Sequence, residues 1–170
     1  MEYASSAWCP WLEKDKKQLE KVQERLVRMI SDVKGASYEE KLKDAGLTTL
    51  EKRRERGDVI EAFKTIKGFN RVEKEKWFTF ESEDARPTRS NSVITDEGEK
   101  RRQFVMKGET ARLETRKNFY SVRITKEWNK IPDWVKEKES INAFKNAYDK
   151  WASKQNRLRE DEELEEEIAS

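Results

Sequence analysis

Apolar residues recur every three or four positions over about residues 14–32, which is the spacing of one face of an α-helix. This apolar stripe consists of Leu19, Val22, Leu26, Met29 and Val33. Gly35 follows it, and glycine is favoured just past the end of a helix. The pattern therefore predicts one long helix over 14–32 with a single apolar stripe.

Two capping boxes mark the starts of the next helices. Ser37 with Glu40, and Thr48 with Glu51, have the spacing at which a hydroxyl caps a helix and the carboxylate three residues on caps the chain in return. The first box predicts a short helix. The second predicts a third helix that runs to about residue 67.

Glycines end both of these helices, at Gly46 and Gly68. A further glycine, Gly57, lies inside the apolar stripe of the third helix, where it costs about 1 kcal/mol relative to alanine. A close crossing by another helix would explain it. The apolar members of that stripe are Leu50, Val59, Ile60, Phe63 and Ile66.

The remaining sequence predicts a hairpin and two more helices. Residues 90–106 are polar with interspersed apolar positions and a turn-like 95–98, which indicates a short β-hairpin. A helix starting at Ala111 or Thr115 runs to Lys130 and is broken at Pro132. Ser140 caps the last helix, whose stripe contains Ile141, Phe144, Tyr148 and Trp151.

These elements predict a mainly α protein in four parts. The parts are a three-helix unit over 1–68, a connector with the possible hairpin over 69–110, a C-terminal helical pair over 111–153 and an acidic tail over 154–170. Hydrophobic residues make up 34% and charged residues 42%, against about 45–50% and about 25% in typical domains. Thin helical layers with large solvated faces are therefore expected, with six Trp and seven Phe supplying much of the buried area.

The net charge of +2 conceals an asymmetry. Residues 86–126 contain 11 basic and 5 acidic side chains, whereas residues 154–170 contain 3 basic and 7 acidic ones. A basic middle suits contact with a polyanion, and an acidic tail aids solubility. In so highly charged a chain, such blocks also arise by chance.

Composition excludes several kinds of chemistry. The chain has no histidine, which rules out histidine-dependent nucleophilic catalysis, and its one cysteine, Cys9, excludes an internal disulfide and makes a structural zinc site implausible. We expect no catalytic residues, metal or cofactor. No apolar stretch approaches the length of a bilayer span, so we expect no membrane partner and an intracellular protein, nuclear or cytoplasmic.

Basic residues near the end of the chain are the candidate binding groups. On one continuous helix Arg116, Arg123 and Lys130 are seven residues apart and align within about 20° per step. Such a row can follow a phosphate backbone without reading base sequence. The other candidates are Lys117 and Lys126 on the same helix, Lys100, Arg101, Arg102 and Lys107 around the hairpin, and Arg53 and Arg54 on the third helix. The alternative is that Arg116 and Arg123 pair with carboxylates such as Glu114 or Glu127.

Several motifs, in order over most of the chain, carry a resemblance to a known family. They are residues 2–10, 19–23, 37–42 and 46–54, then the run Arg116-Lys117-Asn118-Phe119-Tyr120-Ser121-Val122-Arg123 and the run Trp128-Asn129-Lys130-Ile131-Pro132. Together they resemble the C-terminal, post-catalytic region of jockey-like, LINE-type non-LTR retrotransposon reverse transcriptases. The acidic tail is not part of that pattern.

The resemblance implies a thumb and post-thumb region without an enzyme. The tyrosine-X-aspartate-aspartate motif of the catalytic palm occurs nowhere in the chain, and neither the fingers nor the upstream endonuclease is present. The implied partners are a template–primer duplex of RNA–DNA or DNA and a separate palm and fingers chain.

Two functions follow from the sequence. The first is a non-catalytic nucleic-acid-binding remnant of a reverse transcriptase, which grips duplex backbone through lysine and arginine. The second is a helical protein–protein interaction or self-associating module, because stripes that pack on the palm in the parent enzyme would expose apolar surface in isolation.

Overall fold

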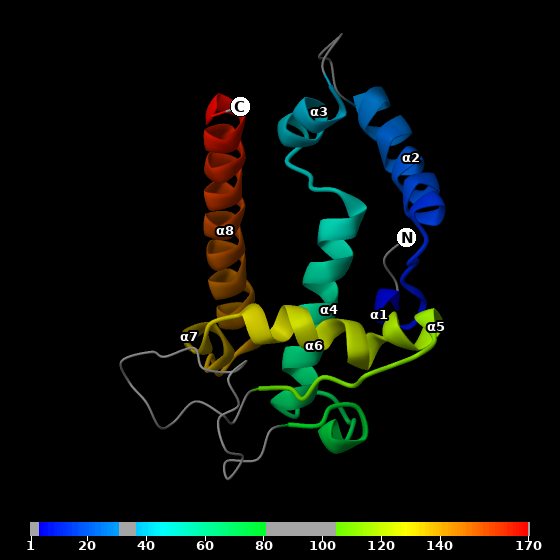
Figure 1. The fold of residues 1–170 in the computed structure, drawn as a ribbon, viewed down its shortest axis with the longest axis vertical. Helices are drawn as coiled ribbons and strands as arrows, with labels where there is room; N and C mark the ends of the chain where they lie inside the picture. The colour runs from blue at the N-terminus through cyan, green and yellow to red at the C-terminus, as the bar shows by residue number, and fades with distance from the viewer. Residues whose placement is uncertain (1–3, 31–36, 81–104, 170) are drawn as a thin grey trace. The chain divides into compact units, whose positions relative to one another are not determined.

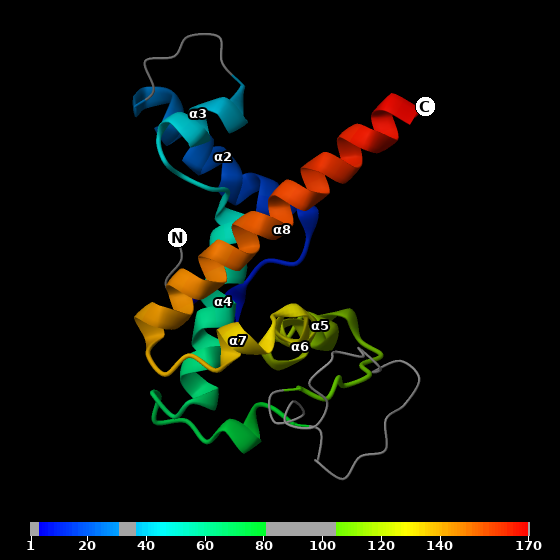
Figure 2. The same cartoon turned by 90° about the vertical axis from the view of Figure 1, so that its left-hand side faces the viewer.

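The computed structural model of the protein describes residues 4–30, 37–80 and 105–169, with side chains described as far as residue 158. The helices in these ranges are shown in Figure 1, and Figure 2 shows α8 running without a break. They are α1 (Ser5–Trp8), α2 (Glu13–Ile30), α3 (Tyr38–Asp44), α4 (Leu50–Ile66), the short 3-10 helix η1 (Lys74–Lys76), α5 (Glu114–Lys117), α6 (Tyr120–Lys130), α7 (Asp133–Lys136) and α8 (Ile141–Ala169). The predicted mainly α fold is confirmed.

The chain divides into two compact units. The first contains residues 1–62 and 109–124, and the second contains residues 63–108 and 125–170. Each unit has its own buried side chains. In the first unit, Val27, Leu42, Leu50 and Val59 are nearly or fully inaccessible to solvent.

Stacked aromatic rings form the centre of the second unit. Phe63, Trp128 and Phe144 are all fully buried. The rings of Phe63 and Phe144 are stacked with centroids 4.0 Å apart, and that of Trp128 lies 6.3 Å from Phe144. Phe63 and Phe144 are thus confirmed as core, whereas Ile66, Ile141, Tyr148 and Trp151 of the same predicted stripes are half-buried.

Helix caps connect α2, α3 and α4 within the first unit. The predicted capping box at Ser37 is confirmed, since the Glu40 amide donates to Ser37 Oγ and the Ser37 amide donates to the Glu40 carboxylate. The second predicted box is not formed as expected. The start of α4 is instead capped by Glu20 of α2, whose carboxylate accepts from the Leu50 amide at 3.1 Å, and by Thr49, whose Oγ1 accepts from the Lys52 amide.

The glycine predictions have different outcomes. Gly46 and Gly68 adopt φ angles of 63° and 74°, the left-handed conformation expected where a helix ends. A helix does lie against Gly57, since a Cβ placed there would lie 3.8 Å from Ser5 Oγ of α1, but this ordinary van der Waals distance is not close enough to require glycine. Gly35 lies outside the described residues.

The helix predicted over 111–130 is two helices. α5 ends at Lys117, and Asn118 caps it by donating its side-chain amide to the Glu114 carbonyl at 2.7 Å before α6 begins. Asparagine readily makes such local side-chain to backbone bonds, which compete with helix continuation. The uniform seven-residue alignment of the candidate basic residues therefore does not apply across this break.

The predicted hairpin lies mostly outside the described residues. Within the described ranges, β pairing is limited to one antiparallel bridge between Phe80 and Met106. Asn129 of α6 fixes the second of these segments, because its side-chain amide accepts from the Met106 amide at 3.0 Å and donates to the Met106 carbonyl at 2.9 Å. This explains in physical terms why an asparagine follows Trp128.

Candidate functional site

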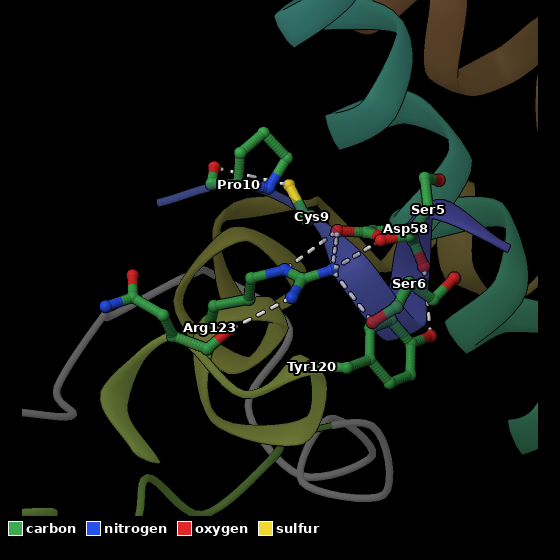
Figure 3. A network of polar contacts seen from close by, with 8 residues as sticks. Ser5, Ser6, Cys9, Pro10, Asp58, Tyr120 and Arg123 are labelled. Atoms are coloured by element: carbon green, nitrogen blue, oxygen red, sulfur yellow. Dashed lines mark hydrogen bonds and ion pairs between the residues drawn. The ribbon is translucent and has the colours of Figure 1, made fainter. Parts of the chain in front are cut away.

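Arg123 is the centre of a polar network inside the first unit, shown in Figure 3. Its Nε and Nη2 donate to Asp58 Oδ2 at 3.0 and 2.9 Å. Nη2 also donates to the Ser6 carbonyl at 3.1 Å, and Nη1 donates to the Asn118 carbonyl at 2.9 Å. The guanidinium therefore joins α1, α4 and the end of α5, and all three of its nitrogens are engaged within the protein.

Burial governs the electrostatics of this network. Only 20% of the Arg123 side chain and 7% of the Asp58 side chain are exposed. Burial raises the pKa of Asp58, and the ion pair with Arg123 opposes that shift. Tyr120 donates its hydroxyl to the Asp58 carbonyl at 3.1 Å, and burial raises its pKa. The network holds α1, α4 and the end of α5 together, and the Asp58 oxygen that Arg123 does not contact, Oδ1, is buried without a hydrogen-bond partner among the described residues.

The other basic residues predicted along this region are mostly paired at the surface. The pairs are Arg116 with Glu109 at 2.7 Å, Lys117 with Glu114, and Lys130 with Glu127 at 2.8 Å. Their side chains are about half exposed, so each pair contributes at most about 1 kcal/mol. The alternative interpretation of Arg116 and Arg123 as ion-pair partners is realised, with Glu109 and Asp58 as the carboxylates.

The remaining predicted residues are dispersed. Lys126 and Lys107 are exposed on the second unit. Arg54 is 2% exposed, with Nε and Nη1 buried and without a hydrogen-bond acceptor, and Arg53 is half-buried. Arg54 is thus a core residue rather than a surface contact. The cluster Lys100, Arg101 and Arg102 lies outside the described residues.

α2 carries a row of basic residues that was not predicted from the sequence. We call it the α2 basic row, and it consists of Lys14, Lys17, Lys21, Arg25 and Arg28. All five side chains are exposed and follow one another at three- and four-residue steps, so they share one side of the helix. Arg28 pairs with Glu24, whereas no described carboxylate forms an ion pair with Lys14, Lys21 or Arg25. The spacing was visible in the sequence but was obscured by the acidic residues between these positions.

Polar contacts hold the opposite side of α2 against α3 and the start of α4, within the first unit. Lys16 Nζ lies 2.6 Å from a Glu51 carboxylate oxygen, and the Gln23 side-chain amide donates to the Thr48 carbonyl at 2.9 Å. Tyr38 donates its hydroxyl to Glu20 at 2.6 Å. Burial, followed by the bond to Glu20, raises the pKa of Tyr38 to about 12. Glu20 thereby faces inward, and its charge is removed from the outer surface.

The predicted apolar stripe of α2 is largely exposed. Val22 is 43% exposed, Leu26 51%, Met29 83% and Ile30 70%. We call these four residues, together with the half-buried Leu19, the α2 seam. Trp8 and Trp11 are also more than 40% exposed. The first unit therefore places one narrow apolar surface beside the α2 basic row.

Comparison with protein-family models, with curated proteins and with solved structures finds no match to this chain. Within the described residues, no helix combines the length and the apolar character needed to cross a membrane. The part of the chain described by the structure also contains no group of three or more Cys, Asp or Glu residues arranged to hold a metal ion. The α2 basic row and the α2 seam are therefore the candidate binding surfaces of the described residues.

Proposed function

We propose that the protein is a non-catalytic nucleic-acid-binding module that holds the backbone of an RNA–DNA or DNA duplex without reading its sequence. The observation that carries this proposal is the α2 basic row. Its ends, Lys14 and Arg28, are 14 residues apart, so the row extends about 21 Å along the helix. Five cations over that length can face several phosphates at once, because a duplex carries one negative charge per about 1.7 Å of its axis.

The chemistry of the row suits phosphate. Lysine and arginine on a solvated helix surface bind phosphate by releasing condensed counterions, and such contacts position a duplex without specifying bases. Lys14, Lys21 and Arg25 need no ion pair to be broken first. Lys126 and Lys107 are secondary candidates, and Arg116, Lys117 and Lys130 can exchange weak surface carboxylate partners for phosphate.

The resemblance to the C-terminal region of LINE-type reverse transcriptases supports the same proposal. A thumb must hold any template–primer, which requires sequence-tolerant backbone contacts. In this proposal the chain is a thumb-like remnant that binds duplex and leaves polymerisation to a separate palm and fingers.

The proposal is tested with a charge-reversed row. The variant Lys14→Glu, Lys21→Glu, Arg25→Glu should bind a fluorescein-labelled RNA–DNA duplex at least about tenfold more weakly at low salt, because each lost phosphate contact forfeits counterion release. Fluorescence anisotropy against salt concentration measures both the affinity and its salt dependence. In the unchanged protein, affinity should fall steeply as salt rises.

A matched control separates location from net charge. The variant Lys43→Glu, Lys52→Glu, Lys150→Glu changes the same number of exposed lysine or arginine positions outside the α2 row and should bind almost as the unchanged protein does. Equal weakening by both variants would show that only net charge matters. No loss in either variant would contradict the assignment of the α2 row.

A further inference from the structure

We propose that the α2 seam is a docking site for one amphipathic helix of a partner protein, and that this partner helix carries acidic residues beside its apolar face. The inference goes beyond nucleic-acid binding, because phosphate contact uses the α2 basic row and leaves the seam unexplained. It rests on three observations about α2: the spacing of the seam, its fixed orientation and the charge along its edge.

The spacing of the seam matches one helix. Leu19, Val22, Leu26 and Met29 alternate by three and four residues, the repeat of 3.5 at which two helices interlock side chains. Such a strict repeat gives a narrow apolar strip, whereas packing against a broad surface needs a wider face. The seam therefore has the width of a helix–helix contact.

The orientation of α2 keeps the seam outside. The inward side is held by Lys16 with Glu51, by Gln23 with the Thr48 carbonyl, and by the buried Val27. Rotating α2 to bury the seam would break these contacts and leave Gln23 and its partner unsatisfied, which is costly for buried polar groups. Only 34% of the residues are hydrophobic, so four neighbouring apolar residues left exposed on one helix indicate a binding surface.

Charge along the edge of the seam identifies the kind of helix. Arg25, three residues after Val22, lies at the flank of the seam, and Lys21 and Lys14 lie on the same side of α2 but farther from the seam. Residues at this edge set partner choice in paired helices. Glutamate or aspartate on the partner would pair with them, whereas an antiparallel second copy of α2 would bring the same basic edge against itself. The charge thus favours an acidic partner helix over self-association.

Designed peptides provide the test. Two labelled helical peptides share a leucine seam of 3.5-residue repeat and differ in their flanks, which are all glutamate in one and all lysine in the other. The full chain should bind the glutamate peptide at least about tenfold more tightly. A scrambled glutamate peptide of identical composition, which has no seam, should bind no better than the lysine peptide.

Variants of α2 separate the apolar contact from the charge. Leu26→Gln should lower the affinity for the glutamate peptide at least about tenfold. Met29→Gln should lower this affinity as well, and because Met29 is 83% exposed, its substitution should not impair folding. Lys21→Glu with Arg25→Glu should reverse the preference, so that the lysine peptide binds better. Equal binding of all three peptides, or no effect of either glutamine variant, would overturn the proposal.

Other occupants have distinct signatures. Sedimentation velocity showing a concentration-dependent dimer that Leu26→Gln abolishes would assign the seam to a second copy and overturn the acidic partner. Seam-dependent binding to phosphatidylserine vesicles, without peptide binding, would assign the seam to a lipid surface and would also overturn the acidic partner. Duplex affinity measured on Leu26→Gln should remain unchanged, so failure of the docking proposal leaves the nucleic-acid proposal standing and the reverse also holds.

Discussion

Arg123 shows that a basic residue with the spacing of a surface phosphate ligand can instead form a buried ion pair. Its spacing from Arg116 and Lys130 suits a row of phosphate ligands, yet its guanidinium is bound to Asp58 and to backbone carbonyls. Nothing local distinguishes these outcomes, since the partner Asp58 is 65 residues away. Long-range pairing of this kind could not be predicted from the sequence.

Removing the guanidinium should be strongly destabilising. Arg123→Gln leaves Asp58 buried without its ion-pair partner, and breaking such a pair costs about 3–5 kcal/mol. Urea denaturation should show this loss in the free energy of unfolding, whereas Lys126→Gln at an exposed position three residues on should change it by less than about 0.5 kcal/mol. Equal, small effects of both substitutions would contradict the structural role.

Tyr38 gives a pH-dependent signature. Its folded pKa of about 12 exceeds the ordinary value of 10, so the contribution of its hydroxyl is fully present below pH 10 and is lost as pH rises from 10 to 12. Tyr38→Phe should lower the free energy of unfolding by about 1 kcal/mol at neutral pH through the lost bond to Glu20.

The measurement is the stability difference between Tyr38→Phe and the unchanged protein, taken by urea denaturation from pH 7 to pH 11.5. Taking the difference removes the titration of lysines, which is common to both proteins. The difference should shrink above pH 10, and a constant difference would show that the Tyr38 hydroxyl is not coupled to folding.

At the scale of single elements, most predicted helix caps and helix ends were confirmed, whereas the side that α2 turns inward could not be predicted. The capping box at Ser37, the cap at Ser140 and the helix-ending Gly46 and Gly68 depend on neighbours within a few residues, and all four are present. The side that α2 turns inward depends instead on distant partners such as Thr48. The periodicity therefore predicted the helix and its apolar stripe but could not reveal that this stripe stays exposed.

Gly57 of α4 offers a stabilising substitution. Its φ lies outside the left-handed region, and a methyl group there meets Ser5 Oγ only at van der Waals distance. Gly57→Ala should therefore raise the free energy of unfolding by about 0.5–1 kcal/mol, since alanine is the better helix former. Thermal unfolding followed by circular dichroism measures the shift. A lower melting temperature would contradict the room for a methyl group beside Ser5.

At the scale of the whole molecule, counting charge over long blocks of sequence does not show which basic side chains the fold leaves without a carboxylate partner. Residues 86–126 carry the largest basic excess, but Arg116, Lys117 and Arg123 of that block have carboxylate partners. The α2 sequence looks balanced, with six basic and four acidic residues, yet Glu20 faces inward and Glu24 is paired with Arg28. Charge is read by a ligand only after folding has sorted which side chains reach solvent.

The bond between Glu20 and the Leu50 amide gives α2 an influence beyond its own surface. That amide belongs to the first turn of α4, a helix which carries Asp58 and hence the grip on Arg123. A ligand that stabilises α2 should also stabilise the first turn of α4. Slower hydrogen exchange of the Leu50 amide would therefore report binding at α2. The exchange rate of this amide would change even though the ligand on α2 makes no contact with α4.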